Sequence, residues 1–197
     1  VIFATSTSET RIELSGVLFV CGKDKLTIAA TDSYRLAEKS VDIKTNTEEE
    51  RQVILPAKTV QELIRVLTAA KGEDLDQEKT GEVVFYLSEN QILVELDNTE
   101  VVSRLIEGQY PDYKQIIPSG SKTKTVVDRN EFVRAVKASS LFSKSGVNDI
   151  NIDFPTGKNK VVVSSASGQA GENISEVDAE TQGDENSIVV NHRYLLD

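Results

Sequence analysis

Residues 52–67 read Gln52-Val-Ile-Leu-Pro-Ala-Lys-Thr-Val-Gln-Glu-Leu-Ile-Arg-Val-Leu67, an apolar strand-like stretch that passes directly into a helical pattern. Pro56 suits the first turn of that helix, where a backbone N–H has no helical partner to lose. One helix face is apolar at the i, i+3, i+4, i+7 positions, which are Val60, Leu63, Ile64 and Leu67. The segment therefore predicts a strand followed by an amphipathic helix.

The same plan recurs twice further along the chain. In residues 125–137, Asp128 is the expected N-cap and Glu131 completes a pattern like a capping box. Phe132 and Val136 then occupy the apolar face, in the places of Val60 and Ile64. A third copy opens at residues 188–197, with Asn191 at the cap position. These copies indicate a structural repeat.

Strand-like runs bounded by turn residues fill the intervals between the predicted helices. Each repeat then has one helix and about four strands, mostly joined as antiparallel meanders, and two repeats make one α+β domain. Pro, Gly and Ser cluster near residues 117–122, so we expect domains at 1–118 and 119–197. The predicted runs are 16–21, 26–30, 34–43, 82–87, 92–96, 100–105, 149–154, 160–165 and 173–179.

Composition restricts the class of protein. The 197 residues carry 22 Lys and Arg against 32 Asp and Glu, a net charge of −10, and 39% are hydrophobic, as in ordinary globular proteins. No apolar run approaches a membrane span, and a single cysteine with no signal-peptide pattern predicts a cytoplasmic protein. Because the chain begins at Val1 and ends inside a predicted helix, we expect a fragment.

Residues suited to catalysis are scarce. The sequence has one histidine, His192, and one cysteine, Cys21, and no phosphate-binding, hydrolase or zinc motif. Asp32, Asp97 and Asp112 stand in turn-like contexts, where Asp commonly bonds its own backbone. A hydrolase with paired carboxylates is the weakest interpretation. We therefore expect a binding protein with no catalytic residue, metal or cofactor.

The polar faces of the first two predicted helices contain basic residues. These faces hold Lys58, Glu62 and Arg65 on one helix, and Asn130, Arg134 and Lys137 on the other. They could simply be solvated. Alternatively, basic faces on an otherwise acidic protein could contact phosphates without reading sequence.

Two further segments combine aromatic, charged and apolar residues. Residues 30–37 read Ala-Thr-Asp-Ser-Tyr-Arg-Leu-Ala, and residues 106–118 place two tyrosines and Pro111 in the expected domain linker. Core packing explains either segment alone, but an apolar linker also suggests a groove.

Three features of the chain belong together: the Thr-Asp-x-x-Arg-Leu-Ala motif at 31–37, the Ser-Arg-Leu-Ile-Glu-Gly-Gln-Tyr-Pro-Asp-Tyr motif at 103–113 and the repeated helix-and-strand plan. Taken together, they resemble the bacterial DNA polymerase sliding clamp, the polymerase III beta subunit. The resemblance covers essentially the whole chain, as an N-terminally truncated middle domain and a C-terminally truncated C-terminal domain. It implies a DNA-clamp fold and a head-to-tail homodimeric ring. In that ring, helices surround duplex DNA and confer processivity on the polymerase without chemistry.

The resemblance assigns functions to the residues singled out above. Contacts with duplex DNA are independent of sequence, and the helical-face argument selects Lys58, Arg65, Arg134 and Lys137 for them. A pocket for linear peptides of the Gln-Leu-x-Leu-Phe type, from polymerase subunits, the clamp loader and repair proteins, is implied at Leu14, Thr31, Ser33, Tyr34, Arg35, Leu36, Pro111, Ile116, Asn191 and Tyr194. Each of these could instead serve packing.

Two departures from the family pattern affect the expected pocket. Gln115 stands where the family commonly has a basic residue, and the family's final strands are absent. We therefore expect reduced peptide affinity. The alternative from another class is a non-catalytic β-rich module that binds protein or carbohydrate, against which stand the lack of a signal peptide and of disulfides.

Overall fold

The computed structural model describes residues 1–197 apart from 9, 46–48, 71–81 and 169. The chain forms two compact units, Val1–Asp112 and Tyr113–Asp197. The division precedes Tyr113, which is buried and begins a short 3-10 helix, η3 (Tyr113–Ile116). The boundary expected after residue 118 therefore falls inside the second unit.

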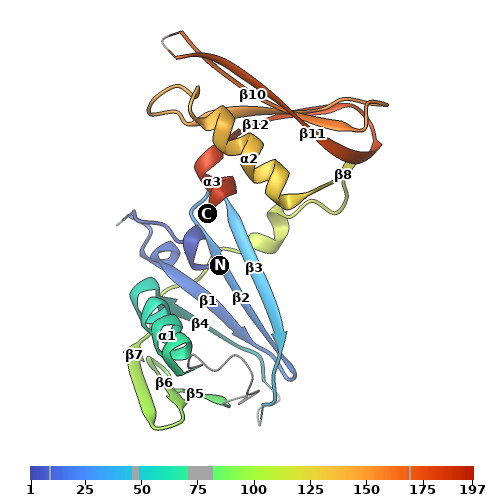
Figure 1. Ribbon diagram of the computed structural model, residues 1–197. Coiled ribbons are helices and arrows are strands. Elements are labelled where there is room, and N and C mark those ends of the chain that lie inside the picture. The colour runs from blue at the N-terminus through green and yellow to red at the C-terminus, as the bar shows by residue number, and fades with distance from the viewer. Residues whose placement is uncertain (9, 46–48, 71–81, 169) are drawn as a thin grey trace. The chain divides into compact units, whose positions relative to one another are not determined.

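The first unit is built on a four-stranded antiparallel sheet of order β3-β2-β1-β4. A second, three-stranded antiparallel sheet of order β5-β6-β7 completes the unit beside helix α1 (Figure 1). Its elements are η1 (Ile2–Ala4), η2 (Ile12–Ser15), β1 (Gly16–Cys21), β2 (Lys25–Thr31), β3 (Leu36–Asp42), β4 (Arg51–Pro56), α1 (Ala57–Ala70), β5 (Val83–Leu87), β6 (Gln91–Leu96) and β7 (Thr99–Arg104).

The core of this unit lies between the two sheets and α1. β1 is a central strand of its sheet and is buried at its first five positions. Val17 and Phe19 join Leu55, Leu63 and Val94 in one hydrophobic cluster. Side chains from both sheets and the helix thus share a core, which stabilises the unit by removing apolar surface from water.

Two details of the α1 segment differ from the sequence prediction. Pro56 is the last residue of β4, paired with Gly16, and the helix begins at Ala57. Ile64, which the spacing assigns to the apolar face, is 48% exposed. Burial is centred on Val60 and Leu63, and Ile64 lies on the flank of that face.

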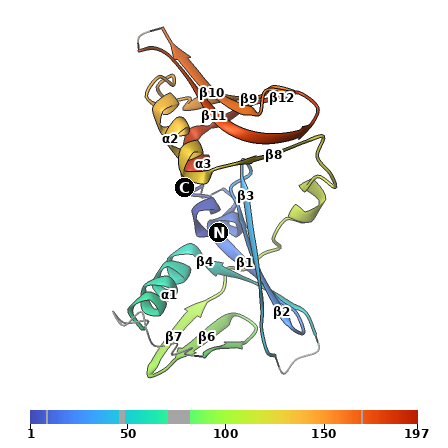
Figure 2. The same cartoon turned by 45° about the vertical axis from the view of Figure 1, so that its right-hand side comes forward.

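The second unit has a five-stranded antiparallel sheet of order β12-β9-β10-β11-β8. Helices α2 and α3 cover the same face of this sheet (Figure 2). Val136 packs there against Ile150, Val161, Val163 and Val177. The elements are β8 (Thr123–Val127), α2 (Arg129–Ser140), β9 (Asp149–Phe154), β10 (Lys160–Ser167), β11 (Gly171–Gly183), β12 (Asn186–Asn191) and α3 (His192–Leu196).

The predicted helix starts and strands are confirmed in most respects. Asp128 caps α2 by accepting hydrogen bonds from the backbone N–H groups of Asn130 and Glu131, both at 2.9 Å. The reciprocal bond of a full capping box, from the Glu131 side chain, is not among the hydrogen bonds of the described residues. All nine predicted strand runs correspond to strands, and the fold class is α+β as expected.

Candidate functional site

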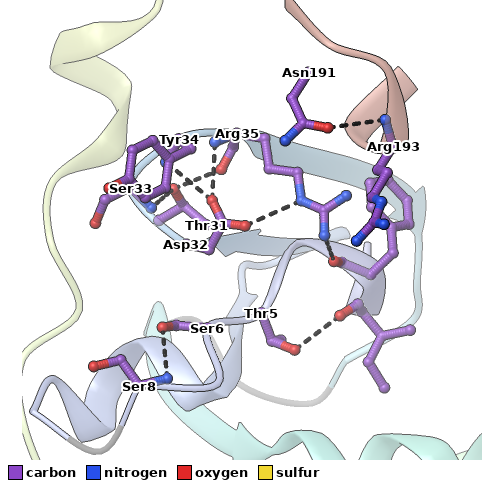
Figure 3. A network of polar contacts seen from close by, with 12 residues as sticks. Thr5, Ser6, Ser8, Thr31, Asp32, Ser33, Tyr34, Arg35, Asn191 and Arg193 are labelled. Atoms are coloured by element: carbon purple, nitrogen blue, oxygen red, sulfur yellow. Dashed lines mark hydrogen bonds and ion pairs between the residues drawn. The ribbon is translucent and has the colours of Figure 1, made fainter. Parts of the chain in front are cut away.

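The turn between β2 and β3 closes on itself through side chains. Asp32 accepts hydrogen bonds from the backbone N–H groups of Tyr34 at 2.9 Å and Arg35 at 3.0 Å. The Thr31 hydroxyl accepts from the N–H of Ser33 at 3.2 Å and donates to the carbonyl of Arg35 at 2.8 Å. Figure 3 shows these bonds gathered in one network. The turn is therefore rigidly held, as a preorganised binding element requires.

Arg35 is held in place from several sides. Its guanidinium lies 3.1 Å from the Asp32 carboxylate in a largely buried ion pair. It also donates to the carbonyl oxygen of Phe3 and stacks over the Phe3 ring, 5.6 Å from the centroid. These contacts restrict the guanidinium to one orientation, so it is a fixed rather than a mobile charge.

The predicted peptide contacts of the first unit differ in exposure. Tyr34 is 84% exposed at the tip of the turn, and Ser33 is exposed beside it. Leu36 and Pro111 are partly buried, whereas Leu14 and Thr31 are buried, with Leu14 only 2% exposed. The structure thus brings residues 31–36 together at one turn. Leu14 itself lies beneath the surface.

Three residues that the sequence analysis did not assign take part in this network. The Arg11 guanidinium lies 3.4 Å from the Ser33 hydroxyl, Phe3 contacts Arg35 as described, and the Tyr110 hydroxyl accepts from the Thr31 backbone N–H at 3.0 Å. Tyr110 stands next to Pro111 in a motif quoted above, but no local spacing connects it to Thr31. Neither Phe3 nor Arg11 belongs to a motif or spacing that the sequence analysis identified.

The remaining predicted peptide contacts belong to the second unit. Ile116 lies in η3 and is 69% exposed, which suits an apolar contact surface. Asn191 caps α3 by accepting from the backbone N–H of Arg193 at 3.0 Å (Figure 3). Tyr194 is partly buried in α3. Asn191 therefore already has a structural role through its side-chain oxygen.

The four predicted DNA contacts are exposed on their helices. Lys58 and Arg65 lie on α1, where the Arg65 guanidinium pairs with Glu62 at 2.8 Å. Arg134 and Lys137 lie on α2, with Arg134 donating to the carbonyl of Asn130 at 3.2 Å. Since α2 has no equivalent of Glu62 paired with its basic residues in the described ion pairs, its face is the more strongly positive of the two.

Cys21 and His192 are the cysteine and the histidine considered for catalysis in the sequence, and both have shifted pKa values. Burial raises the pKa of the Cys21 thiol, which disfavours the reactive thiolate. Burial and the Arg193 charge lower the pKa of His192. Within the described part of the chain, no three His, Cys, Asp or Glu side chains are placed to hold a metal ion. There, too, no helix is long and apolar enough to cross a membrane.

Comparison with known protein families accounts for both units. Residues 1–112 match the central domain of the DNA polymerase III beta subunit, and residues 114–197 match its C-terminal domain. The chain belongs to the DNA polymerase III beta subunit family. The family assignment agrees with the resemblance carried by the motifs at 31–37 and 103–113.

Individual relatives support the same family. A beta sliding clamp of Staphylococcus aureus is 36% identical over 196 residues, covering 99% of this chain and 49% of the relative. A Pseudomonas aeruginosa DNA polymerase sliding clamp has a TM-score of 0.89 at 28% identity, over 99% of this chain and 51% of that structure. A Bacillus subtilis sliding clamp has a TM-score of 0.87 at 30% identity, over 99% and 49%. The chain spans about half the length of these relatives.

Proposed function

We propose that this chain supplies part of a sliding clamp that surrounds duplex DNA and tethers the replicative polymerase in the cytoplasm. The observation that carries the proposal is the match of both units, in order, to two adjacent domains of the beta subunit family. The complete clamp would be a head-to-tail homodimeric ring. Its function is mechanical, since tethering by a ring involves no reaction and the chain acts without catalysis.

The helices support the DNA part of the proposal. A ring that slides must contact the phosphate backbone without reading bases, because base contacts would arrest it. Long basic side chains on exposed helix faces meet that need, and Lys58, Arg65, Arg134 and Lys137 are of this kind. The net charge of −10 on the whole chain repels DNA elsewhere and favours binding only where positive charge is concentrated.

The β2–β3 turn supports binding of linear peptides from polymerase subunits, the clamp loader and repair proteins. Leu36 and Pro111 offer partly buried apolar surface, and Tyr34 offers an exposed aromatic ring. Arg35 offers a guanidinium already fixed by Asp32 and Phe3. Apolar anchors beside oriented polar groups suit a short peptide with Leu and Phe side chains. Ile116, Asn191 and Tyr194 are the proposed contacts of the second unit.

The test is binding of a fluorescent Gln-Leu-x-Leu-Phe-type peptide, measured by anisotropy. We expect saturable binding that a Leu36→Asp substitution weakens at least about tenfold, because a charge in an apolar subsite must be desolvated. Val41→Asp is the matched control, since Val41 lies on the same strand β3 and is 41% exposed. It should leave the affinity unchanged.

Three outcomes would contradict the expected result, each for a different reason. If neither this chain nor a full-length family member bound the peptide, peptide recognition at this site would be wrong. If only the full-length protein bound, and Leu36→Asp abolished that binding, residues beyond 1–197 would be needed to complete the pocket. Equal weakening by Leu36→Asp and Val41→Asp would indicate damage to β3 rather than loss of a contact.

A further inference from the structure

A buried hydrogen bond connects two stretches of the first unit that lie far apart in sequence. The phenolic oxygen of Tyr110 accepts a hydrogen bond from the backbone N–H of Thr31 at 3.0 Å, across a separation of 79 residues. The Tyr110 side chain is only 8% exposed and Thr31 is 6% exposed. The bond therefore forms away from bulk water, where an unpaired N–H would carry its full desolvation cost.

The position of Thr31 in the sheet explains why it needs this partner. Pairing between β1 and β2 runs from Cys21 with Leu26 to Leu18 with Ala29, and Thr31 lies beyond that last pair. No β1 residue is paired with Thr31. The hydroxyl of Tyr110 thus substitutes for a sheet acceptor at the end of the strand.

The backbone N–H groups of residues 32–35 are satisfied within the turn. Those of Ser33, Tyr34 and Arg35 donate to side chains of Thr31 and Asp32, and that of Asp32 makes a long 3.4 Å bond to the carbonyl of Arg35. Residues 32–35 are consequently bonded within the turn, whereas the N–H of Thr31 donates to a distant element.

The contacts of the turn with Phe3 and Arg11 are formed by side-chain atoms. These are the Arg35 bond to the Phe3 carbonyl and the 3.4 Å contact between the Arg11 guanidinium and the Ser33 hydroxyl. Both contacts act on the turn through rotatable side chains, whereas the Tyr110 bond holds the Thr31 backbone N–H directly and away from water.

We infer that Tyr110 is a positioning residue for peptide recognition: its hydroxyl sets the position of the 31–36 turn relative to Pro111. The inference rests on the proposed function, because it concerns the same site. Tyr110 directly precedes Pro111, so one side chain ties together both stretches of proposed peptide contacts in this unit. Tyr110 would not itself touch the peptide, since its hydroxyl is engaged beneath the turn.

The test compares Tyr110→Phe with two controls. Phe keeps the buried ring and removes only the acceptor. Tyr86→Phe removes a hydroxyl that bonds Glu95 on the three-stranded sheet of the same unit. Ile92→Val shortens a fully buried core side chain of that unit without touching the turn, which reports the effect of lost stability alone. Peptide affinity and amide hydrogen exchange are measured for each variant.

We expect Tyr110→Phe to raise the peptide Kd by about 3- to 10-fold, the effect of losing one buried hydrogen bond. Exchange of the Thr31 amide should accelerate at least about tenfold without peptide, since its acceptor is gone. Tyr86→Phe and Ile92→Val should leave the peptide Kd and the exchange rate of the Thr31 amide at their wild-type values. That combination would support positioning by the hydroxyl.

Other results would overturn the inference and identify why. An unchanged Kd in Tyr110→Phe, with wild-type binding intact, would refute positioning while leaving the proposed function standing. An equal loss of affinity in Ile92→Val would show a general stability effect. If wild-type protein bound no peptide but Thr31 exchange still accelerated, the hydrogen bond would be structural only in this chain, and the comparison with a full-length family member would decide whether peptide recognition at this site is wrong.

Discussion

Ser33 adopts a left-handed backbone conformation, with φ at +78°, which is uncommon for a residue with a Cβ. The energetic cost of this conformation is offset by hydrogen bonds within the turn. The Asp32 carboxylate accepts from the backbone N–H groups of Tyr34 and Arg35, and the Thr31 hydroxyl accepts from that of Ser33. Asp32 thus performs the turn-forming role that its sequence context predicts. The same carboxylate pairs with Arg35, so turn geometry and charge placement depend on one side chain.

Gly16 shows a different constraint, because a methyl group there would have no space. An added Cβ would lie 2.6 Å from Ile54 Cγ2, 2.7 Å from the Leu55 carbonyl oxygen and 2.8 Å from Ile106 Cδ1. We expect Gly16→Ala to lower the free energy of unfolding of the first unit by about 1–3 kcal/mol, as overpacking does. Denaturant unfolding measures it. Gly22→Ala, whose Cβ meets only the Lys25 carbonyl oxygen at 3.3 Å, should cost distinctly less.

His192 predicts a pH dependence of stability. Its Nδ1 is buried without a hydrogen-bond partner among the described atoms, and burial followed by the Arg193 charge lowers the pKa below the usual value of 6.5. The unfolded chain then binds more protons than the folded one, so the contribution is complete above about pH 6.5 and is lost as pH falls through the folded pKa. The lost stability should be visible in unfolding curves between pH 7.5 and 5.

A His192→Gln variant serves as the reference for that experiment, since it cannot titrate in this range. The stability of the wild type relative to the variant should decrease as the pH falls. A constant difference across the range would contradict the lowered pKa.

Among the elements, α2 combines a buried apolar face with a charged outer face. Ala135 and Val136 are buried against the sheet, while Arg134 and Lys137 are exposed, as helical periodicity requires. The Asp128 cap fixes where the helix begins, and the apolar positions that pack on the sheet determine which residues face outward.

The basic face of α2 predicts a salt-dependent contact with duplex DNA. Replacing Arg134 and Lys137 by Ser removes two positive charges, so the slope of log affinity against log salt should become shallower by up to about 2. Anisotropy titrations of a labelled duplex at several salt concentrations measure this slope. Lys160→Ser is the control, because Lys160 lies on β10 and pairs with Glu176. An equal change in slope for the control would mean that overall charge, not the helix face, governs binding.

At the scale of the whole chain, each unit has its own hydrophobic cluster. Leu55 belongs to the cluster of the first unit and Ile150 to that of the second, and the two clusters share no residue. Both side chains are buried completely or nearly so. Separate cores allow each unit to fold around its own contacts.

Core truncations should therefore act on one unit at a time. We expect Leu55→Ala and Ile150→Ala each to cost about 2–5 kcal/mol, from lost transfer energy and the cavity left behind. Hydrogen exchange followed by mass spectrometry should show faster exchange in peptides of the first unit for Leu55→Ala, and of the second for Ile150→Ala. Loss of protection throughout the chain from either substitution would show that the units unfold together.

Much of the fold is predictable from local sequence. The repeated strand-to-helix segments, the Asp128 cap and the strand runs depend on residues a few positions apart, and such spacing determines which side chains share a face. The exposure of Lys58, Arg65, Arg134 and Lys137 follows from the same periodicity. The motifs at 31–37 and 103–113 were sufficient to indicate the family.

Tertiary structure alone decided the details that shape the candidate site. Ile64 lies at the flank of its helix face because the sheet packs against Val60 and Leu63. The partners of Arg35 and Thr31, which are Phe3 and Tyr110, come from segments remote in sequence. Local spacing carries no information about such contacts, because the sheet brings distant backbone together only when the chain is folded.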